Sequence, residues 1–467
     1  MTKAPVFAVI GHPNEGKSSV VATLVENDQI RISPRPGETV EARTYPVTVD
    51  GEDVIAFVDT PGFQNPVQTL GWLRTCGLSE GEAVSAFLER FGTDPGLAHE
   101  CELLAPLHAG AGIIYVLDAS RPLRQVDKAE MEILRLTGRP RMAILNCKTG
   151  EEEFLEQWKA ELRKHFNMVR MFNALRATFA ERLRLLESLR ALEQDWEEAL
   201  GRVVDAFTRD WKRRNVECAA LVCDFLQRAV SRTETASLDE AEDRSTVEAR
   251  LARRLEEGVR ADEKRLHDQI CLLFRHDRRS FDLPAQSVLR QDLFSKTTWT
   301  VFGLGRRKLV VAAVAAGGAA GAALDLATLG HSLGLFATVG GAAAGLAALF
   351  QGERLVRGKV LGLDIGQREV KVGPVGTVQW IFILLDRFLL HYWYVIHWSH
   401  AWREGDHGPG LADGKRLGLT DTWNREARSL CAGFFKAATE GDGPATMARE
   451  VELRRFLEEE LERLSRL

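Results

Sequence analysis

The chain has 467 residues, of which 45% are hydrophobic and 27% are charged, a composition typical of globular proteins with an ample core. The length suggests about two or three domains, and the net charge of −5 argues against a broad nucleic-acid-binding surface. The seven cysteines are scattered and odd in number, so we expect reduced thiols in a cytoplasmic protein. We expect no signal peptide, because the first apolar run is typical of a strand.

Residues 11–18 read Gly-His-Pro-Asn-Glu-Gly-Lys-Ser, which fits the phosphate-loop pattern G-x-x-x-x-G-K-[ST]. A strand-like run precedes this loop at 5–10, and a helix-forming run follows at 18–26. Since the glycines let backbone N–H groups face an anion at a helix N-terminus, the loop predicts a nucleotide-phosphate site. The residues expected to contact the nucleotide there are Gly11, Asn14, Glu15, Gly16, Lys17, Ser18 and Ser19.

A second motif supports the first. Residues 53–58 have the pattern of a buried strand and end in Asp-Thr-Pro-Gly at 59–62. A carboxylate at Asp59 can hold a water of Mg²⁺, and the Gly62 N–H can approach a γ-phosphate. Residues 43–49 alternate and are followed by Asp-Gly, which predicts a hairpin that pairs the two strands antiparallel, as in regulatory GTPases.

Together, the phosphate loop, the Pro-Gly-Glu-Thr run at 36–39 and the Asp-Thr-Pro-Gly run resemble the Era/TrmE-like branch of translation-factor-class GTPases. The resemblance implies that Thr39 belongs to the first switch and ligates Mg²⁺ beside Ser18 when the γ-phosphate is bound. It also implies that something other than the hydrophobic Phe63 positions the attacking water. Asn14 matches an asparagine that helps to coordinate K⁺ in some relatives; the alternative is a role in loop conformation alone.

Two further buried strands are predicted at 110–118 and 140–146. The second should end in the guanine-reading motif Asn-Lys-x-Asp, but here Asn146 is followed by Cys-Lys-Thr. Because the base-reading aspartate is missing, guanine preference over adenine stays open. The residues expected around the base are Asn146, Lys148, Asn173 and Ala174.

The long connection from 63 to 109 carries two helix-like segments, 79–91 and 97–109. This insertion leaves the second switch region, so either a response to the nucleotide or passive decoration is compatible with its position. Between about residues 175 and 285 strand signals vanish. Apolar residues at three- and four-residue steps over 185–211 and 247–274 predict two long helices, separated by a polar break at 237–245. The alternatives are a packed helical hairpin and a lever or self-association stalk.

Residues 309–350 form a Gly/Ala-rich apolar stretch, interrupted by Asp325 and flanked by basic residues on both sides. The stretch contains small-xxx-small pairs such as Gly317 and Gly321, and each arm is shorter than the ~20 residues of a comfortable membrane span. A shallow membrane hairpin, two thin spans and a buried soluble hairpin all fit. We expect association with the cytoplasmic face of the inner membrane, or a protein partner, through 309–402.

Residues 360–372 alternate like a short strand or hairpin, and 378–402 predict an aromatic-rich helix that is either core or interfacial. Neighbouring Asp386 and Arg387, interpreted as an ion pair, disfavour a membrane span. His391, His397 and His400 suggest a metal site, but no cysteine or carboxylate completes a ligand set, so none is expected. Residues 453–464 predict an amphipathic helix suited to docking or pairing.

These patterns predict an α/β P-loop G domain, with a mostly parallel sheet and helices on both faces, followed by a largely α-helical C-terminal region. The expected divisions are a G domain at 1–185, a long helical region at 186–300 and a C-terminal domain at 301–467. This arrangement resembles an uncharacterised bacterial group that joins an Era-like G domain to a C-terminal domain of unknown function with a Gly/Ala-rich segment.

The expected function is a GTP/GDP-binding switch with slow, Mg²⁺-dependent hydrolysis. Catalysis is assigned to Lys17, Thr39 and Gly62, and the metal to Ser18, Thr39 and Asp59, with K⁺ as a further ion. One rival is a ribosome-assembly GTPase, for which no basic or KH-like module is visible. The other is a membrane scaffold that binds nucleotide without turnover. Self-association is compatible with the helical region.

Overall fold

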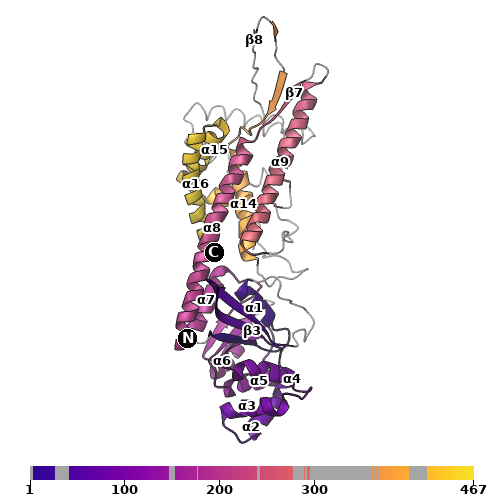
Figure 1. Cartoon of the computed structure of the whole chain (residues 1–467), viewed down its shortest axis with the longest axis vertical. Coiled ribbons are helices and arrows are strands. Elements are labelled where there is room, and N and C mark those ends of the chain that lie inside the picture. The colour runs from indigo at the N-terminus through magenta and orange to yellow at the C-terminus, as the bar shows by residue number, and fades with distance from the viewer. Residues whose placement is uncertain are drawn as a thin grey trace.

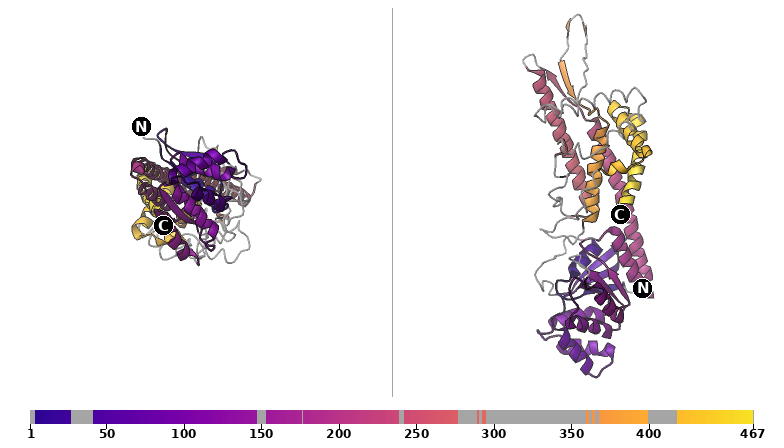
Figure 2. Two further views of the ribbon diagram at one scale, coloured as in Figure 1. Left: turned by 90° about the horizontal axis from the view of Figure 1, so that it is seen from below. Right: turned by 180° about the vertical axis from the view of Figure 1, so that it is seen from behind.

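The computed structural model describes residues 4–26, 41–146, 153–175, 177–238, 242–276, 289, 292–294, 359–360, 363–364, 368–398 and 418–466. The molecule is elongated, with an α/β part at one end and long helices extending away from it (Figures 1 and 2). Thr39, Lys148, His400 and the Gly/Ala-rich stretch 309–350 lie outside the described residues.

The α/β part is built on one six-stranded sheet of order β2-β3-β1-β4-β5-β6. β2 runs antiparallel to β3, and the other neighbours are parallel, which confirms the predicted hairpin and the mostly parallel sheet. The hairpin turn places Asp50 and Gly51 at φ 52° and 83°, as a tight turn between twisted strands requires. The strands are β1 (Val6–Ile10), β2 (Arg43–Val49), β3 (Glu52–Asp59), β4 (Gly112–Asp118), β5 (Arg141–Asn146) and β6 (Met168–Met171).

Helices cover both faces of this sheet, as predicted. One face packs against α1 (Lys17–Val25), α7 (Phe179–Arg190) and the start of α8 (Glu197–Ser231). The other face carries α2 (Pro66–Thr75), α3 (Glu80–Phe91), α4 (Ala98–His108), α5 (Gln125–Leu136) and α6 (Leu155–His165). The two helices predicted in the long insertion are α3 and α4. α2 was not predicted; its Trp72 packs edge-on against Phe87 and Phe91 at 5.5 Å.

The predicted continuous helix over 185–211 is wrong. α7 ends at Arg190, the chain turns through the short 3-10 helix η1 (Gln194–Trp196), and α8 begins at Glu197. Trp196 contacts Phe7 of β1 edge-on, with ring centroids 4.9 Å apart. Both helices bury their apolar residues against the same sheet face. The hydrophobic stripe therefore continues across the break, and the spacing of apolar residues does not reveal where the first helix ends.

α8 passes from the sheet into the helical part, where it packs with α9 (Arg244–Leu273), α14 (Gln379–His397), α15 (Arg425–Glu440) and α16 (Gly443–Leu464) around one hydrophobic core (Figure 1). Its 35 residues correspond to a rod of roughly 50 Å. The C-terminal helix α16 docks through buried Leu453, Leu457 and Leu461, as its amphipathic pattern predicted. α8 is therefore the element shared by the two parts.

The prediction of no strands in the helical middle is also wrong. β7 (Glu234–Leu238) pairs antiparallel with β10 (Arg368–Val372) at the end of the molecule far from the six-stranded sheet (Figure 1). The strands β8 (Lys359–Val360) and β9 (Leu363–Asp364) form a short hairpin, which agrees with the strand signal predicted over 360–372. β7 is only half-buried and polar, so its pairing partner rather than its own hydrophobicity makes it a strand.

The aromatic-rich helix α14 is a core helix, with Trp380 and Tyr392 fully buried. Its two central charges have partners on other elements. Arg387 makes a bidentate pair with Glu263 of α9, at 2.6 and 3.0 Å, and Asp386 accepts a hydrogen bond from the Thr420 N–H at 2.7 Å. The interpretation of Asp386 and Arg387 as a mutual pair therefore missed their long-range partners.

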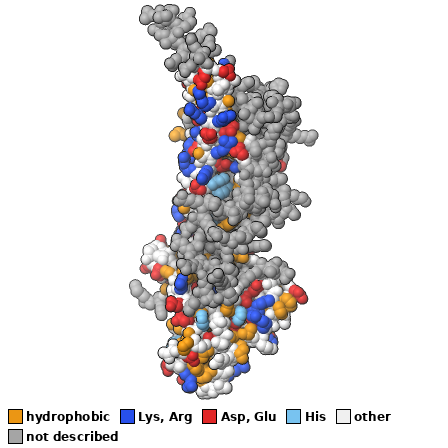
Figure 3. Space-filling model, turned by 90° about the vertical axis from the view of Figure 1, so that its right-hand side faces the viewer, with side chains coloured by type: hydrophobic (Ala, Val, Ile, Leu, Met, Phe, Trp, Pro, Cys, Tyr) orange, Lys and Arg blue, Asp and Glu red, His pale blue; other side chains and the backbone are white. Residues whose placement is uncertain are grey.

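Within the described ranges, no helix is both long enough and apolar enough to cross a bilayer. The same residues contain no group of three or more His, Cys, Asp and Glu side chains able to hold a metal ion. The outer side of α9 is charged, and Figure 3 shows Lys and Arg side chains gathered there with Asp and Glu. Arg253, Arg254 and Lys264 are among its exposed residues, which agrees with the amphipathic pattern of this helix.

Candidate nucleotide-binding site

The loop between β1 and α1 has the geometry of a phosphate cradle. Gly16 adopts a left-handed conformation at φ 101°, and a Cβ there would lie 2.7 Å from Asn146 Nδ2, so only glycine fits. The next residue, Lys17, is buried, and its ammonium donates to the carbonyl oxygens of Gly11 at 3.2 Å and His12 at 3.1 Å. The positive charge of Lys17 therefore lies over the loop, where the phosphates are expected.

Ser18 and Asp59 meet at the metal end of the loop. The Ser18 hydroxyl donates to Asp59 Oδ2 at 2.6 Å, and the second carboxylate oxygen, Oδ1, is buried without a hydrogen-bond partner in the described part of the chain. Burial raises the pKa of Asp59, while the Ser18 hydrogen bond and the charge of Lys17 oppose this shift. A hydroxyl and a carboxylate with spare oxygen capacity are ligands that Mg²⁺ prefers, so the pair fits this ion.

The Asp-Thr-Pro-Gly segment contacts the phosphate loop directly. A Cβ on Gly62 would lie 2.6 Å from the backbone N of Pro13, and the Thr60 hydroxyl donates to the Val9 carbonyl at 2.8 Å. Contact with Pro13 therefore requires glycine at position 62, whatever its N–H binds. Phe63 is fully buried, so its ring is directed away from solvent.

The side chain of Glu15 is directed into the protein rather than toward the nucleotide. It is buried and accepts from Arg121 Nη2 at 2.6 Å, and Arg121 also pairs with Asp127 at 2.9 Å. Burial alone would lower the pKa of Arg121, but the hydrogen bond of Asp127 and the charge of Glu15 raise it. Only the backbone of Glu15 is left for the nucleotide contact that the motif predicts.

Asn146, at the end of β5, binds the backbone of Glu15. Its Nδ2 donates to the Glu15 carbonyl at 3.0 Å, and its Oδ1 is buried with no partner among the described residues. Asn146 therefore supports the phosphate loop. Contact with a base, predicted for Asn146 and Lys148, remains a prediction.

The loop after β6 lies beside α1, where a base-contacting loop is expected. The Thr23 hydroxyl donates to the Ala174 carbonyl at 3.1 Å and to the Ser19 carbonyl at 2.9 Å. Asn173 shapes this loop by accepting from the Leu175 N–H at 3.0 Å. Asn14, at φ 66°, adopts a left-handed conformation that asparagine tolerates, so its loop-conformation role is compatible with a role in K⁺ binding.

Sequence reasoning missed a second buried carboxylate below the loop. Glu130 of α5 bonds His12 Nδ1 at 2.9 Å and accepts from the Tyr115 hydroxyl at 2.8 Å. Burial raises the pKa of Glu130, and the hydrogen bond with His12 opposes this shift. The available signal was a charged residue at an otherwise apolar position of the α5 pattern.

Comparison with known proteins gives matches over both parts of the chain. Residues 159–462 match the family described as Domain of unknown function (DUF3482), and residues 6–147 match the family described as 50S ribosome-binding GTPase. GTPase Der of Streptomyces coelicolor is 26% identical over 146 residues, which cover 31% of this chain and 26% of that protein. GTPase Era of Nitrosomonas eutropha is 37% identical over 62 residues, covering 13% of this chain and 21% of that protein.

Among solved structures, a crystal structure of Era in complex with MgGDPNP and a segment of 16S ribosomal RNA has a TM-score of 0.31 at 16% identity, covering 59% of this chain and 90% of that chain. The chain spans about a quarter of the length of the curated relatives that it matches. The DUF3482 match extends over more than half of the chain. The chain therefore belongs to the DUF3482 family and carries a P-loop GTPase-type domain at its N-terminal end.

Proposed function

We propose that the protein binds GTP and GDP with Mg²⁺, hydrolyses GTP slowly and acts as a nucleotide-controlled switch. The observation that carries this proposal is the joint placement of buried Lys17 over the phosphate loop and of Ser18 against Asp59 at 2.6 Å. The GTPase match over residues 6–147 gives independent support.

In this proposal, Lys17 neutralises the β- and γ-phosphates, and the backbone N–H groups of the phosphate loop bind their oxygens. Ser18 and Thr39 would hold Mg²⁺ directly and Asp59 through water. The ion, when bound, would neutralise charge that develops between the β- and γ-phosphates. The Gly62 N–H would bind the γ-phosphate, so its loss on hydrolysis would release the switch segments.

Because Phe63 is buried and apolar, the attacking water would be oriented by other groups. We propose K⁺ beside Asn14 as one such group, as in the relatives that use this ion. The guanine pocket would be completed by Asn146, Lys148 and the Asn173-Ala174 loop.

The decisive experiment is titration of the full chain with GTP, GDP and ATP in the presence of Mg²⁺, in K⁺ and then in Na⁺. Lys17→Ala should abolish binding, whereas Lys164→Ala, which removes an exposed lysine paired with Glu161 on α6, should not. Unchanged nucleotide affinity in Lys17→Ala would refute the proposed site. Equal binding of ATP and GTP would refute guanine preference.

Two wider roles extend the proposal. The match to 50S ribosome-binding GTPases favours a ribosome-assembly role, which nucleotide-dependent co-sedimentation with 50S subunits would test.

The charge-free runs within 309–350 and their basic flanks favour association with the cytoplasmic face of the inner membrane. Flotation with anionic vesicles should then be lost on deletion of 309–350, and flotation of the deleted chain would exclude this segment as the anchor. If nucleotide binds without turnover in K⁺, the scaffold alternative replaces the switch.

A further inference from the structure

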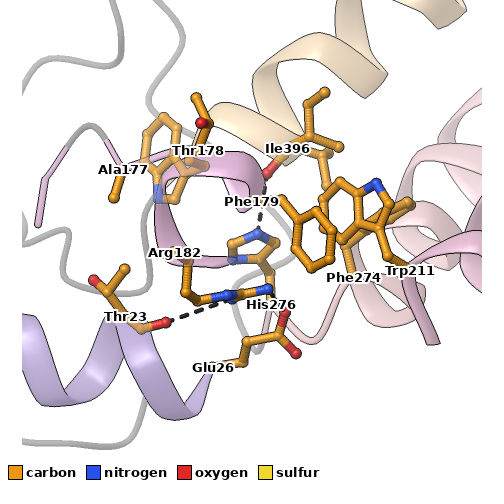
Figure 4. A pocket seen from close by; sticks show the side chains of 12 residues that line it. Thr23, Glu26, Ala177, Thr178, Phe179, Arg182, Trp211, Phe274, His276 and Ile396 are labelled. Carbon is orange, nitrogen blue, oxygen red and sulfur yellow. Dashed lines mark hydrogen bonds and ion pairs between the residues drawn. The ribbon is translucent and has the colours of Figure 1, made fainter. Parts of the chain in front are cut away.

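The nucleotide-binding part and the helical part meet at a buried group of charges, here called the Glu26 cluster. Glu26 directly follows α1 as its C-terminal cap, and its side chain lines the pocket shown in Figure 4. Its carboxylate accepts from Arg182 of α7 at 2.6 Å and from Arg214 of α8 at 2.7 Å, and it pairs with Arg275 at 3.1 Å. Asp210 of α8 completes the cluster by pairing with Arg275 at 3.0 Å and with Arg214.

The Glu26 cluster is much less exposed to solvent than an ordinary surface ion pair. Glu26, Arg182 and Arg214 are 9%, 5% and 2% exposed. The cluster holds three arginines and two carboxylates, so removal of the Glu26 charge would leave buried guanidinium groups poorly compensated. The packing of α1 against α7 and α8 therefore depends on the Glu26 carboxylate.

Two hydrogen bonds join the Glu26 cluster to the base side of the nucleotide site. Arg182 Nη1 donates to the Thr23 carbonyl at 3.4 Å, one turn before Glu26 (Figure 4). The Thr23 hydroxyl in turn donates to the Ala174 carbonyl at 3.1 Å, in the loop expected to contact the base. Displacement of Arg182 would therefore act on this loop and on the last turn of α1 together.

On the other side, the cluster is continuous with the packing of the helical part. Arg275 lies two residues beyond the end of α9, and the intervening Phe274 packs edge-on against Trp211 of α8 at 5.2 Å. Trp211 also stacks on Phe179 of α7 at 4.2 Å, and His276 donates to the Val395 carbonyl of α14 at 3.1 Å (Figure 4). The ends of α9 and α14 thus contact the same small region as α1 and α7.

We propose that Glu26 and Arg182 are positioning residues that link occupancy of the nucleotide site to the packing of α8 and α9. The nucleotide-binding function proposed above is assumed. Because such coupling is reciprocal, nucleotide binding should tighten the end of α9, and loosening of the cluster should weaken nucleotide binding. Glu26 also directly precedes residues 27–40, which carry Thr39, so the cluster is adjacent in sequence to the first switch.

The test compares three full-length variants by hydrogen exchange and nucleotide titration. Glu26→Gln removes the central charge. Arg275→Gln is the milder variant, because its side chain is 50% exposed and Arg182 and Arg214 still pair with Glu26 when it is removed. Arg202→Gln is the matched control, since it breaks an exposed 2.8 Å pair with Glu52 that also joins α8 to the sheet.

In the wild type and in Arg202→Gln, binding of GDP or a non-hydrolysable GTP analogue with Mg²⁺ should slow exchange over residues 266–276. Arg275→Gln should lose this response, and Glu26→Gln should bind GDP about 5- to 150-fold more weakly, the usual range of coupling between sites. A wild type that binds no nucleotide would overturn the proposed function and this coupling together. Retention of the α9 response in Arg275→Gln, or of GDP affinity in folded Glu26→Gln, would overturn the coupling and leave the proposed function standing.

Discussion

Asn146 provides the sharpest test of how the phosphate loop is held. In the structure its Nδ2 donates to the carbonyl of Glu15 at 3.0 Å, and the side chain is 4% exposed. Asn146→Ala would leave that carbonyl without this donor, at a cost of about 1–3 kcal/mol for a buried polar group. If the cost falls on the nucleotide-bound form, affinity should drop roughly 5- to 150-fold.

The two roles of Asn146 predict different dependence on the base. If the asparagine acts by supporting the loop, GDP and IDP, which differ only at the guanine amino group, should lose affinity by the same factor. Calorimetric titration of both nucleotides measures this directly, and a thermal melt of the free protein shows how much of the cost falls on the unbound state. Asn167→Ala is the control, because Asn167 accepts from the Arg141 N–H at 3.1 Å at the opposite end of β5. Undiminished affinity in Asn146→Ala would refute the supporting role, and a loss confined to GDP would show that Asn146 contacts the guanine amino group.

Three further predictions follow from buried charges and thiols. Because burial raises the pKa of Asp59, the metal-free protein should lose stability as the pH rises through that pKa. Its affinity for Mg²⁺ should fall as the pH is lowered through the same pKa. Thermal melts and Mg²⁺ titrations over about pH 4 to 7 test these two pH dependences. Arg387→Met should lower the free energy of unfolding, measured by urea denaturation, by about 3–5 kcal/mol because Glu263 stays buried and unpaired. The double variant Glu263→Leu with Arg387→Met should recover most of this loss. An equal loss in the single and the double variant would contradict this account. Burial raises the pKa of Cys223 to about 12, so iodoacetamide near pH 8 should modify half-buried Cys76 long before Cys223, and the reverse order would be inconsistent with the packing.

Much of the nucleotide-binding part could be predicted from the sequence because its signals are local. The phosphate loop, the Asp50-Gly51 hairpin and the buried strands each depend on a few neighbouring residues whose backbone preferences and apolar runs act over short distances. The same signals predicted the helices of the insertion and the docking of α16. They placed Lys17, Ser18 and Asp59 in one site because the carboxyl ends of adjacent parallel strands lie at one edge of a sheet.

Local patterns predicted less well where the outcome depends on a distant partner. β7 is polar and half-buried, and it becomes a strand because β10 supplies the hydrogen-bonding edge. The break between α7 and α8 has no signature in the apolar stripe, because both helices cover the same sheet face. The spacing of apolar residues indicates which face of a helix is buried, but it does not indicate where the chain turns.

Short motifs with fixed backbone requirements were enough to predict the phosphate-loop fold and to bring Ser18 and Asp59 together at its end, where they are proposed to hold Mg²⁺. The partners of the buried charges, in contrast, are set by the packing of distant elements: Glu15 pairs with Arg121, Arg387 pairs with Glu263, and Glu26 joins α1 to α7, α8 and the end of α9. A charged side chain in a sequence has many candidate partners of opposite sign. Burial selects among them, because an ion removed from water must find the partner that the packing of distant elements brings within hydrogen-bonding distance.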